Sequence, residues 1–179
     1  MEAVKLLFLA IAAAVGYGIL HDQVTARVCV EYFTIGHPRI IASEEPTILA
    51  FVWGTLATWW VGLLLGLPLV VVCRAGKRPG LTARDVRPAV VTLLALMAFT
   101  SLVAGCCGYL LSRAGAIRLQ GWLAARLPLE KHDRFLADAW AHAAAYGMGF
   151  LGGTAVLCWL WSKRRRRVRL GAARADALC

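Results

Sequence analysis

Long apolar stretches separated by short polar connections dominate this chain of 179 residues. Asp, Glu, Lys and Arg are all missing from residues 6–21, 46–73, 88–112 and 139–162. A helix needs about 20 apolar residues to cross the roughly 30 Å of bilayer hydrocarbon. The last three stretches reach that length, and the first nearly does. The pattern predicts an all-α membrane protein, a four-transmembrane-helix bundle. Its predicted spans are residues 3–20, 47–72, 89–111 and 139–161.

Prolines predict where these helices begin or bend. Pro68 should kink the second span or end its regular hydrogen bonding. Pro88 suits the first turn of the third helix. Pro128 suits the start of a fourth helix that projects from the membrane before its apolar part begins. The first span could instead be a signal peptide, since Ala12-Ala13-Ala14 offers small residues for cleavage. Its weak positive charge favours an uncleaved helix.

Small residues recur at helical spacing in two spans. The second contains Gly62 and Gly66. In the fourth, Gly149 and Gly153 continue the i+4 series that begins with Ala141 and Ala145. Such spacing permits close contact between helices in lipid. We expect these glycines to contact neighbouring helices, either in other membrane proteins or in a second copy of the chain.

Charge predicts the orientation of the bundle. The net charge is +10, and twelve of the twenty Lys and Arg residues lie in the second connection, 74–87, and the tail, 163–179. Basic residues near span ends favour the cytoplasmic side. We therefore expect a multi-pass protein of a bacterial inner membrane, with both termini cytoplasmic. Residues 1–162 form one membrane domain, with outer connections at 21–46 and 112–138. This distribution does not indicate a nucleic-acid partner.

A basic run begins the tail, directly after Trp159 and Trp161. It consists of Lys163, Arg164, Arg165, Arg166 and Arg167. We interpret it as a signal that fixes the inner end of the fourth span, beside an aromatic belt. The alternative is a binding site for anionic lipid headgroups.

The first outer connection is unusually apolar. Residues 24–33 alternate in a period of two, which predicts a short extended segment lying over the helix ends as an irregular outer cap. Gly36-His37-Pro38 then predicts a turn. We expect this segment to bring Glu31 and His37 towards His21 and His142.

Histidine and tyrosine gather on the predicted outer side. Candidate metal ligands there are His21, Asp22, Glu31, His37 and His142. Imidazole and carboxylate suit zinc, copper or iron. Haem between His21 and His142 is a variant. The six cysteines lack zinc-ribbon spacing. We interpret them as small apolar residues.

The fourth helix places polar residues on one face. Arg134, Asp138, His142 and Tyr146 follow each other at i+4. Asp138 is expected to orient His142, because carboxylates fix the tautomers of functional histidines. Tyr146 and Tyr32 are expected to support the site.

Two blocks carry a family resemblance. Residues 17–23, Tyr-Gly-Ile-Leu-His-Asp-Gln, precede Glu-Tyr-Phe-Thr at 31–34, and Ala141-His142 precedes Tyr146 and Gly152-Gly153. These residues resemble a signature of small uncharacterised bacterial four-span inner-membrane proteins. The resemblance implies a four-helix architecture and brings no activity.

Three function classes remain open. Short loops and glycine spacing favour an accessory or assembly protein without enzymatic activity. The outer polar cluster favours a metal- or haem-binding redox protein. A small transporter or channel subunit is the third, although no internal repeat is evident. Motifs for hydrolysis are missing: there is neither a Gly-x-Ser-x-Gly elbow nor a phosphate-binding loop.

Overall fold

The computed structural model describes residues 1–76 and 78–176, with side chains described as far as residue 167. Within these ranges the chain is helical and contains no strand. The elements are α1 (Glu2–Val28), α2 (Val30–Thr34), α3 (Pro46–Leu56), α4 (Trp59–Arg74), α5 (Ala83–Arg113), α6 (Gly121–Arg126), a short 3-10 helix η1 (Leu129–Lys131) and α7 (His132–Asp176). Four helical segments are long and apolar enough to cross a membrane, as predicted: α1, α3 with α4, α5, and η1 with α7 to Arg167.

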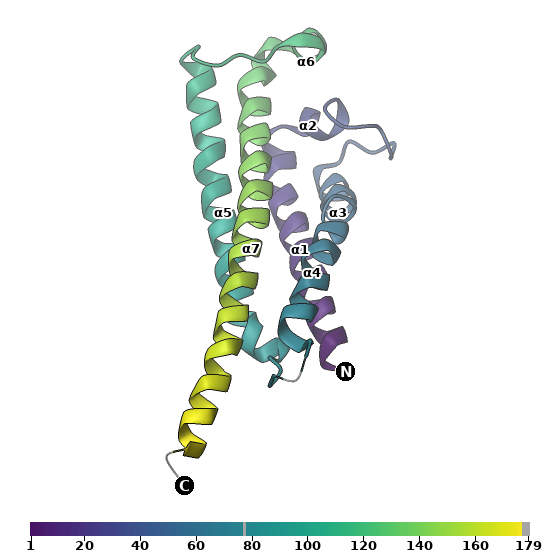
Figure 1. Cartoon of the computed structure of the whole chain (residues 1–179). Helices are drawn as coiled ribbons and strands as arrows, with labels where there is room; N and C mark the ends of the chain where they lie inside the picture. The colour runs from purple at the N-terminus through teal and green to yellow at the C-terminus, as the bar shows by residue number, and fades with distance from the viewer. Residues whose placement is uncertain (77, 177–179) are drawn as a thin grey trace.

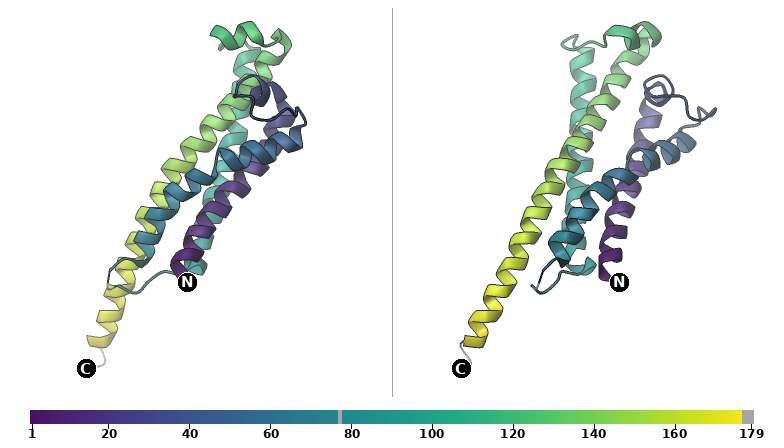
Figure 2. Two further views of the ribbon diagram at one scale, coloured as in Figure 1. Left: turned by 90° about the vertical axis from the view of Figure 1, so that its right-hand side faces the viewer. Right: turned by 45° about the vertical axis from the view of Figure 1, so that its right-hand side comes forward.

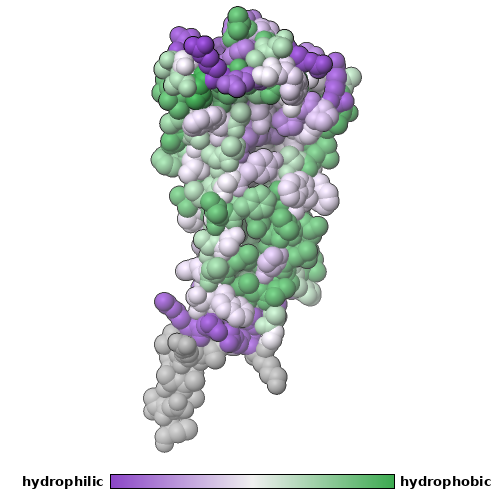
Figure 3. All heavy atoms as spheres, turned by 45° about the horizontal axis from the view of Figure 1, so that its top comes forward, coloured by the Kyte–Doolittle hydropathy of each residue, from purple (hydrophilic) through white to green (hydrophobic). Residues whose placement is uncertain are grey.

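The long helices form two pairs (Figure 1). In one, α1 packs along α3 and α4, and in the other α5 packs along α7. The pairs meet where α4 contacts α7 and α1 contacts α5. Both termini lie at one end, here called the basic end, while α2 and α6 lie at the other, the cap end (Figure 2). In Figure 3, hydrophobic residues cover the side in view between hydrophilic residues at both ends.

The prediction of an extended segment between the first two spans is wrong. Helix α1 continues to Val28, well beyond the predicted end at Leu20. Only Cys29 has extended backbone geometry, and α2 begins at the next residue. Asp22, Thr25 and Ala26 are buried, at the i, i+3, i+4 spacing of one helical face, whereas Val24 and Val28 are exposed. Burial here therefore follows a helical period, and the apolar alternation does not reflect a two-sided strand.

The second span is interrupted at Ala57 and Thr58, between α3 and α4. Pro68 lies inside α4, which continues to Arg74. The helix is therefore interrupted about ten residues before the proline that was expected to disturb it. At the interruption the Thr58 hydroxyl donates to the carbonyl of Gly54. A break at this depth is tolerated where the freed backbone groups face protein instead of lipid.

Helix α5 begins earlier than the prolines predict. Thr82 caps it, in a reciprocal capping box with Asp85, so Pro88 lies within the helix and not in its first turn. Pro128 does precede a helical start, since it caps η1, and α7 follows at His132.

The predicted glycine contacts form within the chain. A Cβ on Gly62 would lie 2.7 Å from the Cα of Ile11 in α1, and one on Gly66 would meet Leu7. Those on Gly149 and Gly153 would meet Met97 and Leu65, respectively. These positions serve the packing of the two helix pairs. Association with other proteins through further surfaces stays a prediction.

Arg164 closes the basic end from within. Its side chain is 1% exposed and donates to three carbonyls: Val72 at 2.9 Å, Arg78 at 2.7 Å and Pro79 at 3.0 Å. Carbonyls at the end of a helix lack partners in that helix, and a cation is favoured beside them. Arg164 thereby ties α7 to the end of α4 and the connection that follows it.

The rest of the basic run is divided among several contacts. Arg167 forms an ion pair with Asp85. Lys163 and Arg165 lie over the rings of Trp159 and Trp161, and Arg166 is exposed. A role for these residues in orientation or lipid binding remains a prediction.

Candidate functional site

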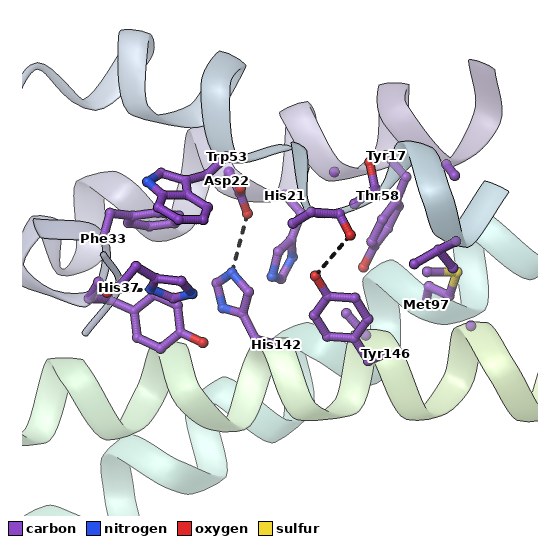
Figure 4. A pocket seen from close by; sticks show the side chains of 17 residues that line it. Tyr17, His21, Asp22, Phe33, His37, Trp53, Thr58, Met97, His142 and Tyr146 are labelled. Carbon is purple, nitrogen blue, oxygen red and sulfur yellow. Dashed lines mark hydrogen bonds and ion pairs between the residues drawn. The ribbon is translucent and has the colours of Figure 1, made fainter. Parts of the chain in front are cut away.

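A cavity of about 90 Å³ lies between the two helix pairs, towards the cap end (Figure 4). Helix α1 forms one wall and α7 the opposite wall, with α2, α3 and the interruption before α4 closing the remaining sides. Its lining consists of Ala14, Tyr17, Gly18, His21, Asp22, Tyr32, Phe33, His37, Trp53, Ala57, Thr58, Val61, Met97, His142, Ala145, Tyr146 and Gly149. Most of these groups are apolar or aromatic, so the few polar atoms stand out.

Three potential metal ligands converge at this cavity. His21 and Asp22 come from α1, and His142 comes from α7. One ligand atom from each side chain lies within 4.8 Å of the other two. Asp22 and His142 are closest, with Oδ1 and Nε2 3.2 Å apart and side chains only 7% and 12% exposed. The sequence-based grouping of these three residues is therefore matched by their positions.

The hydrogen bonds of His142 define its tautomer. Its Nδ1 lies 2.8 Å from the backbone carbonyl of Asp138, which can only accept, so Nδ1 carries a proton. In a neutral ring Nε2 then has a lone pair directed at the Asp22 carboxylate. We expected the Asp138 carboxylate to orient this ring. The backbone carbonyl of Asp138 does so instead, because it lies one turn before His142.

His21 is held in the same way. The hydroxyl of Ser101 on α5 donates to the Ala141 carbonyl at 2.7 Å, which leaves its oxygen free to accept from His21 Nδ1 at a long 3.5 Å. This assigns the proton to Nδ1 and the lone pair to Nε2. Nε2 of His21 is buried and has no hydrogen-bond partner among the described residues. A buried polar atom without a partner is costly, so this nitrogen is available to accept from water or to bind a cation.

The spacing suits a single metal ion better than haem. With metal bonds of about 2 Å, neighbouring ligand atoms in a tetrahedral site lie roughly 3.3 Å apart. The separation of 3.2 Å between His142 and Asp22 matches this value, and His21, whose ligand atom lies within 4.8 Å of the other two, completes the group. The rings of His21 and His142 touch edge to face, with centroids 4.5 Å apart. That contact leaves no room for a macrocycle between them, so the haem variant does not fit.

Aromatic rings enclose the cap-end side of the cavity. Tyr32 stacks on His142 with centroids 4.5 Å apart, and Phe33 lies nearly parallel to His37 at 6.0 Å. Burial raises the pKa of Tyr32 well above its ordinary value, so the phenol stays protonated. His37 Nδ1 donates to the Tyr32 carbonyl at 2.8 Å. His37 thus lines the cavity as expected, but outside the group of three ligands.

Glu31 belongs to a separate cluster. Its carboxylate pairs with Lys131 at 2.8 Å and accepts from the Cys29 thiol at 3.4 Å. Burial opposes the charge of Glu31, but the hydrogen bond from Lys131 and further donors outweigh it and lower the pKa. Burial and the contact with Glu31 raise the pKa of Cys29 to about 12, so this thiol stays protonated. The expectation that Glu31 joins the histidines is wrong, because α2 turns it towards η1.

The other two expected supporting residues take different positions. Tyr146 lines the cavity, and its hydroxyl donates to the carbonyl of Ala57 at 3.5 Å, where the second span is interrupted. The Asp138 carboxyl group is 2% exposed and lies near Asp22 and the backbone of Cys29, beside the hollow between α1, α5 and α7. Its Oδ2 has no partner among the described residues. Asp138 therefore supports His142 only through its backbone.

Sequence reasoning missed several residues of the site. Ser101 lies in an apolar span with no polar neighbour at helical spacing, so nothing in the pattern connects it to His21. Phe33 and Trp53 resemble ordinary core or interface residues. Thr58 carried a usable signal, since threonine and the nearby Gly54 both have a lower helix propensity than alanine.

The fold and the site define a class: an all-helical protein with four helices suited to span a membrane and a buried cluster of histidine and aspartate between them. No family model, curated protein or solved structure matches the chain. The resemblance of residues 17–23 and 31–34 to a family of bacterial inner-membrane proteins therefore remains a sequence-based prediction.

Proposed function

We propose that this chain is a membrane-embedded metal-binding protein, with one zinc- or iron-class ion held by His21, Asp22 and His142. The observation that carries the proposal is the unpartnered, buried Nε2 of His21 beside two further ligand atoms. Two imidazoles and one carboxylate bind Zn²⁺ and Fe²⁺ well.

The second contacts of the two histidines also favour a metal. Each ring donates Nδ1–H to an oxygen, at Asp138 for His142 and at Ser101 for His21. Metal-bound histidines use such contacts to fix the tautomer that directs a lone pair at the ion. Without an ion, His142 Nε2 and the Asp22 carboxylate are both acceptors and need a shared proton. A cation satisfies both of them and His21 together.

Three protein ligands leave a coordination position open. Sites of this kind bind water or a further ligand, whereas structural zinc sites use four protein ligands. The cavity beside the three ligands is small and walled by aromatic rings, so a further ligand would have to be small. The function supported best is therefore binding of a small molecule at a metal centre. Metal binding is better supported than an accessory role, because the glycines expected to form partner surfaces pack within the chain.

The test is metal binding by the full chain, purified in mild detergent without a histidine tag. Elemental analysis should find about one Zn²⁺ or Fe²⁺ per chain. Loading with Co²⁺ should give the visible absorption of a low-coordinate site. His142→Ala should abolish both signals. His132→Ala is the matched control, because His132 lies outside the cavity and its ring hydrogen-bonds to the Leu127 carbonyl.

Two results would contradict the proposal. Equal metal content in the wild type and His142→Ala would place the ion elsewhere. A metal-free wild type that also fails to take up Zn²⁺, Fe²⁺ or Co²⁺ would leave Asp22 and His142 as a proton-sharing structural pair.

The same helix arrangement supports a proposal for the orientation in the membrane. The basic end carries both termini and the basic residues Arg74, Arg78 and Lys163 to Arg167, which favours the cytoplasmic side of a bacterial inner membrane. The metal site then lies in the outer half of the bilayer. A reporter that is active only in the cytoplasm should be active when it is fused to the C-terminus, and a reporter that is active only in the periplasm should not. Activity of a periplasm-specific reporter there would reverse the orientation.

A further inference from the structure

A second hollow, larger than the cavity, runs along the outside of α1 between that helix, α5 and α7. Its volume is about 1280 Å³. The walls are mainly small and apolar and belong to stretches without charge, for example Ala12, Gly16, Leu94 and Ala98. We call it the α1/α5 groove. Because these residues lie in segments suited to span a membrane, the groove lies at the depth of bilayer hydrocarbon.

The groove ends in two cations at the cap end. Arg134 is exposed and forms no ion pair within the described part of the chain. Arg27 donates to Gln23 and Thr47, and no carboxylate among the described residues pairs with it. Guanidinium groups bind phosphate through paired, charge-assisted hydrogen bonds. Asp138 also lines the groove but is 2% exposed, so the exposed charge at this mouth comes from the two arginines. An apolar channel with two exposed arginines at its mouth has the polarity that an anionic phospholipid requires.

We propose that the α1/α5 groove binds one anionic phospholipid of the surrounding bilayer, with an acyl chain along Gly16 and Ala98 and the phosphate at Arg134 and Arg27. A helix from another protein is less well matched, because it would have to supply acidic groups at membrane-interface depth. Gly16 is central to the fit. A Cβ built there meets no atom within 4 Å, so the wall is open at this point.

The groove and the metal cavity share a wall. Tyr17 and His21 line both, so the bound acyl chain passes beside the helix turn that carries a proposed metal ligand. The lipid site nevertheless rests on the groove alone, and it requires no metal to be present.

The experiment is native mass spectrometry of the full chain, released from detergent after addition of dioleoyl phosphatidylglycerol or dioleoyl phosphatidylcholine. The wild type should retain one phosphatidylglycerol and much less phosphatidylcholine. Gly16→Leu fills the groove and should reduce retention of both lipids about tenfold or more. Arg134→Gln should remove the preference for phosphatidylglycerol. Gly147→Leu is the matched control, since Gly147 also has open space at Cβ but lies outside the groove.

Equal retention by Gly16→Leu and Gly147→Leu would overturn the proposal, and so would a wild type that binds both lipids alike. A complex that carries a second protein chain in place of lipid would identify the groove as a protein interface and also overturn it. Melting temperatures of the variants show whether each remains folded. Metal content measured on the same samples separates failure here from failure of the metal site.

Discussion

Gly18 of α1 and Gly54 of α3 lie so close that neither position has room for a side chain. A Cβ on Gly18 would lie 2.5 Å from the Gly54 carbonyl oxygen, and one on Gly54 would lie 2.6 Å from the Cα of Ile19. Backbone atoms block both positions, so neither neighbour can rotate away. This contact holds α1 against the interruption at Ala57 and sets the position of His21 and Asp22, one turn further along α1.

Gly18→Ala should therefore destabilise the protein, although alanine favours helices over glycine by about 1 kcal/mol. Overpacking against backbone costs about 1–3 kcal/mol, so the net effect is a loss. The melting temperature in detergent measures it. Gly147→Ala is the control, since its Cβ would meet nothing within 4 Å and should leave the melting temperature equal or higher. Equal effects at both positions would argue against the close contact.

Ser101→Ala should weaken metal binding without touching a ligand. The variant removes the acceptor that holds the proton of His21 on Nδ1, so the lone pair is no longer fixed on Nε2. Loss of such a contact lowers metal affinity by about 10–100-fold. Nitrogen chemical shifts of labelled histidine should show the tautomer change even in metal-free protein. Thr100→Ala is the control, because that hydroxyl bonds only within its own helix. An unaltered tautomer in Ser101→Ala would refute the assignment.

Arg164→Met should be strongly destabilising. Three carbonyls lose their donor, and each buried carbonyl without a partner costs about 1–3 kcal/mol. Arg164→Lys keeps the charge but cannot reproduce the planar set of donors, so it should rescue only part of the loss. Thermal unfolding in detergent measures both variants. Arg166→Met removes an exposed charge from the same run and should change stability little. If Arg166→Met lowered thermal stability as much as Arg164→Met, the stabilisation would come from net charge and not from the carbonyl contacts.

The Glu31–Lys131 pair should contribute pH-dependent stability. The pKa of Glu31 is lowered from its ordinary value of 4.5, so its contribution is present above that value and disappears as pH falls through the lower folded pKa. Glu31→Gln should cost up to about 1 kcal/mol near neutral pH, and the difference should shrink below the ordinary pKa. Unfolding curves of both proteins against pH measure this. Glu44→Gln removes a more exposed and longer ion pair and should show a smaller effect.

The sequence predicted the number of long helices because spans require uninterrupted apolar length, which can be counted. It misplaced the end of α1 and the break in the second span, since tertiary contacts decide both. The second span is interrupted at Ala57 and Thr58, just after Gly54 of α3 lies against Gly18 of α1, and the end of α1 at Val28 packs against α2 and α3. Pro68 and Pro88 both lie inside helices, whereas the capping box of Thr82 and Asp85 marks the start of α5.

The candidate site was predicted in part for a similar reason. His21, Asp22 and His142 were expected together because they are polar residues at the same predicted depth. Glu31 satisfied the same criterion but pairs with Lys131. The choice between the two depends on the direction in which α2 leaves Cys29, which no local pattern encodes. Ser101 could not be found, because its role depends on the packing of α5 against both α1 and α7.

The three residues that meet at the cavity come from α1 and α7, so the ribosome makes two of them well before the third. No truncated chain that lacks α7 contains the complete ligand set. An ion bound there would stabilise only the finished bundle, because a ligand favours the state that binds it. Metal loading would then report that insertion and helix assembly are complete, and a chain stalled before the final helix would remain empty.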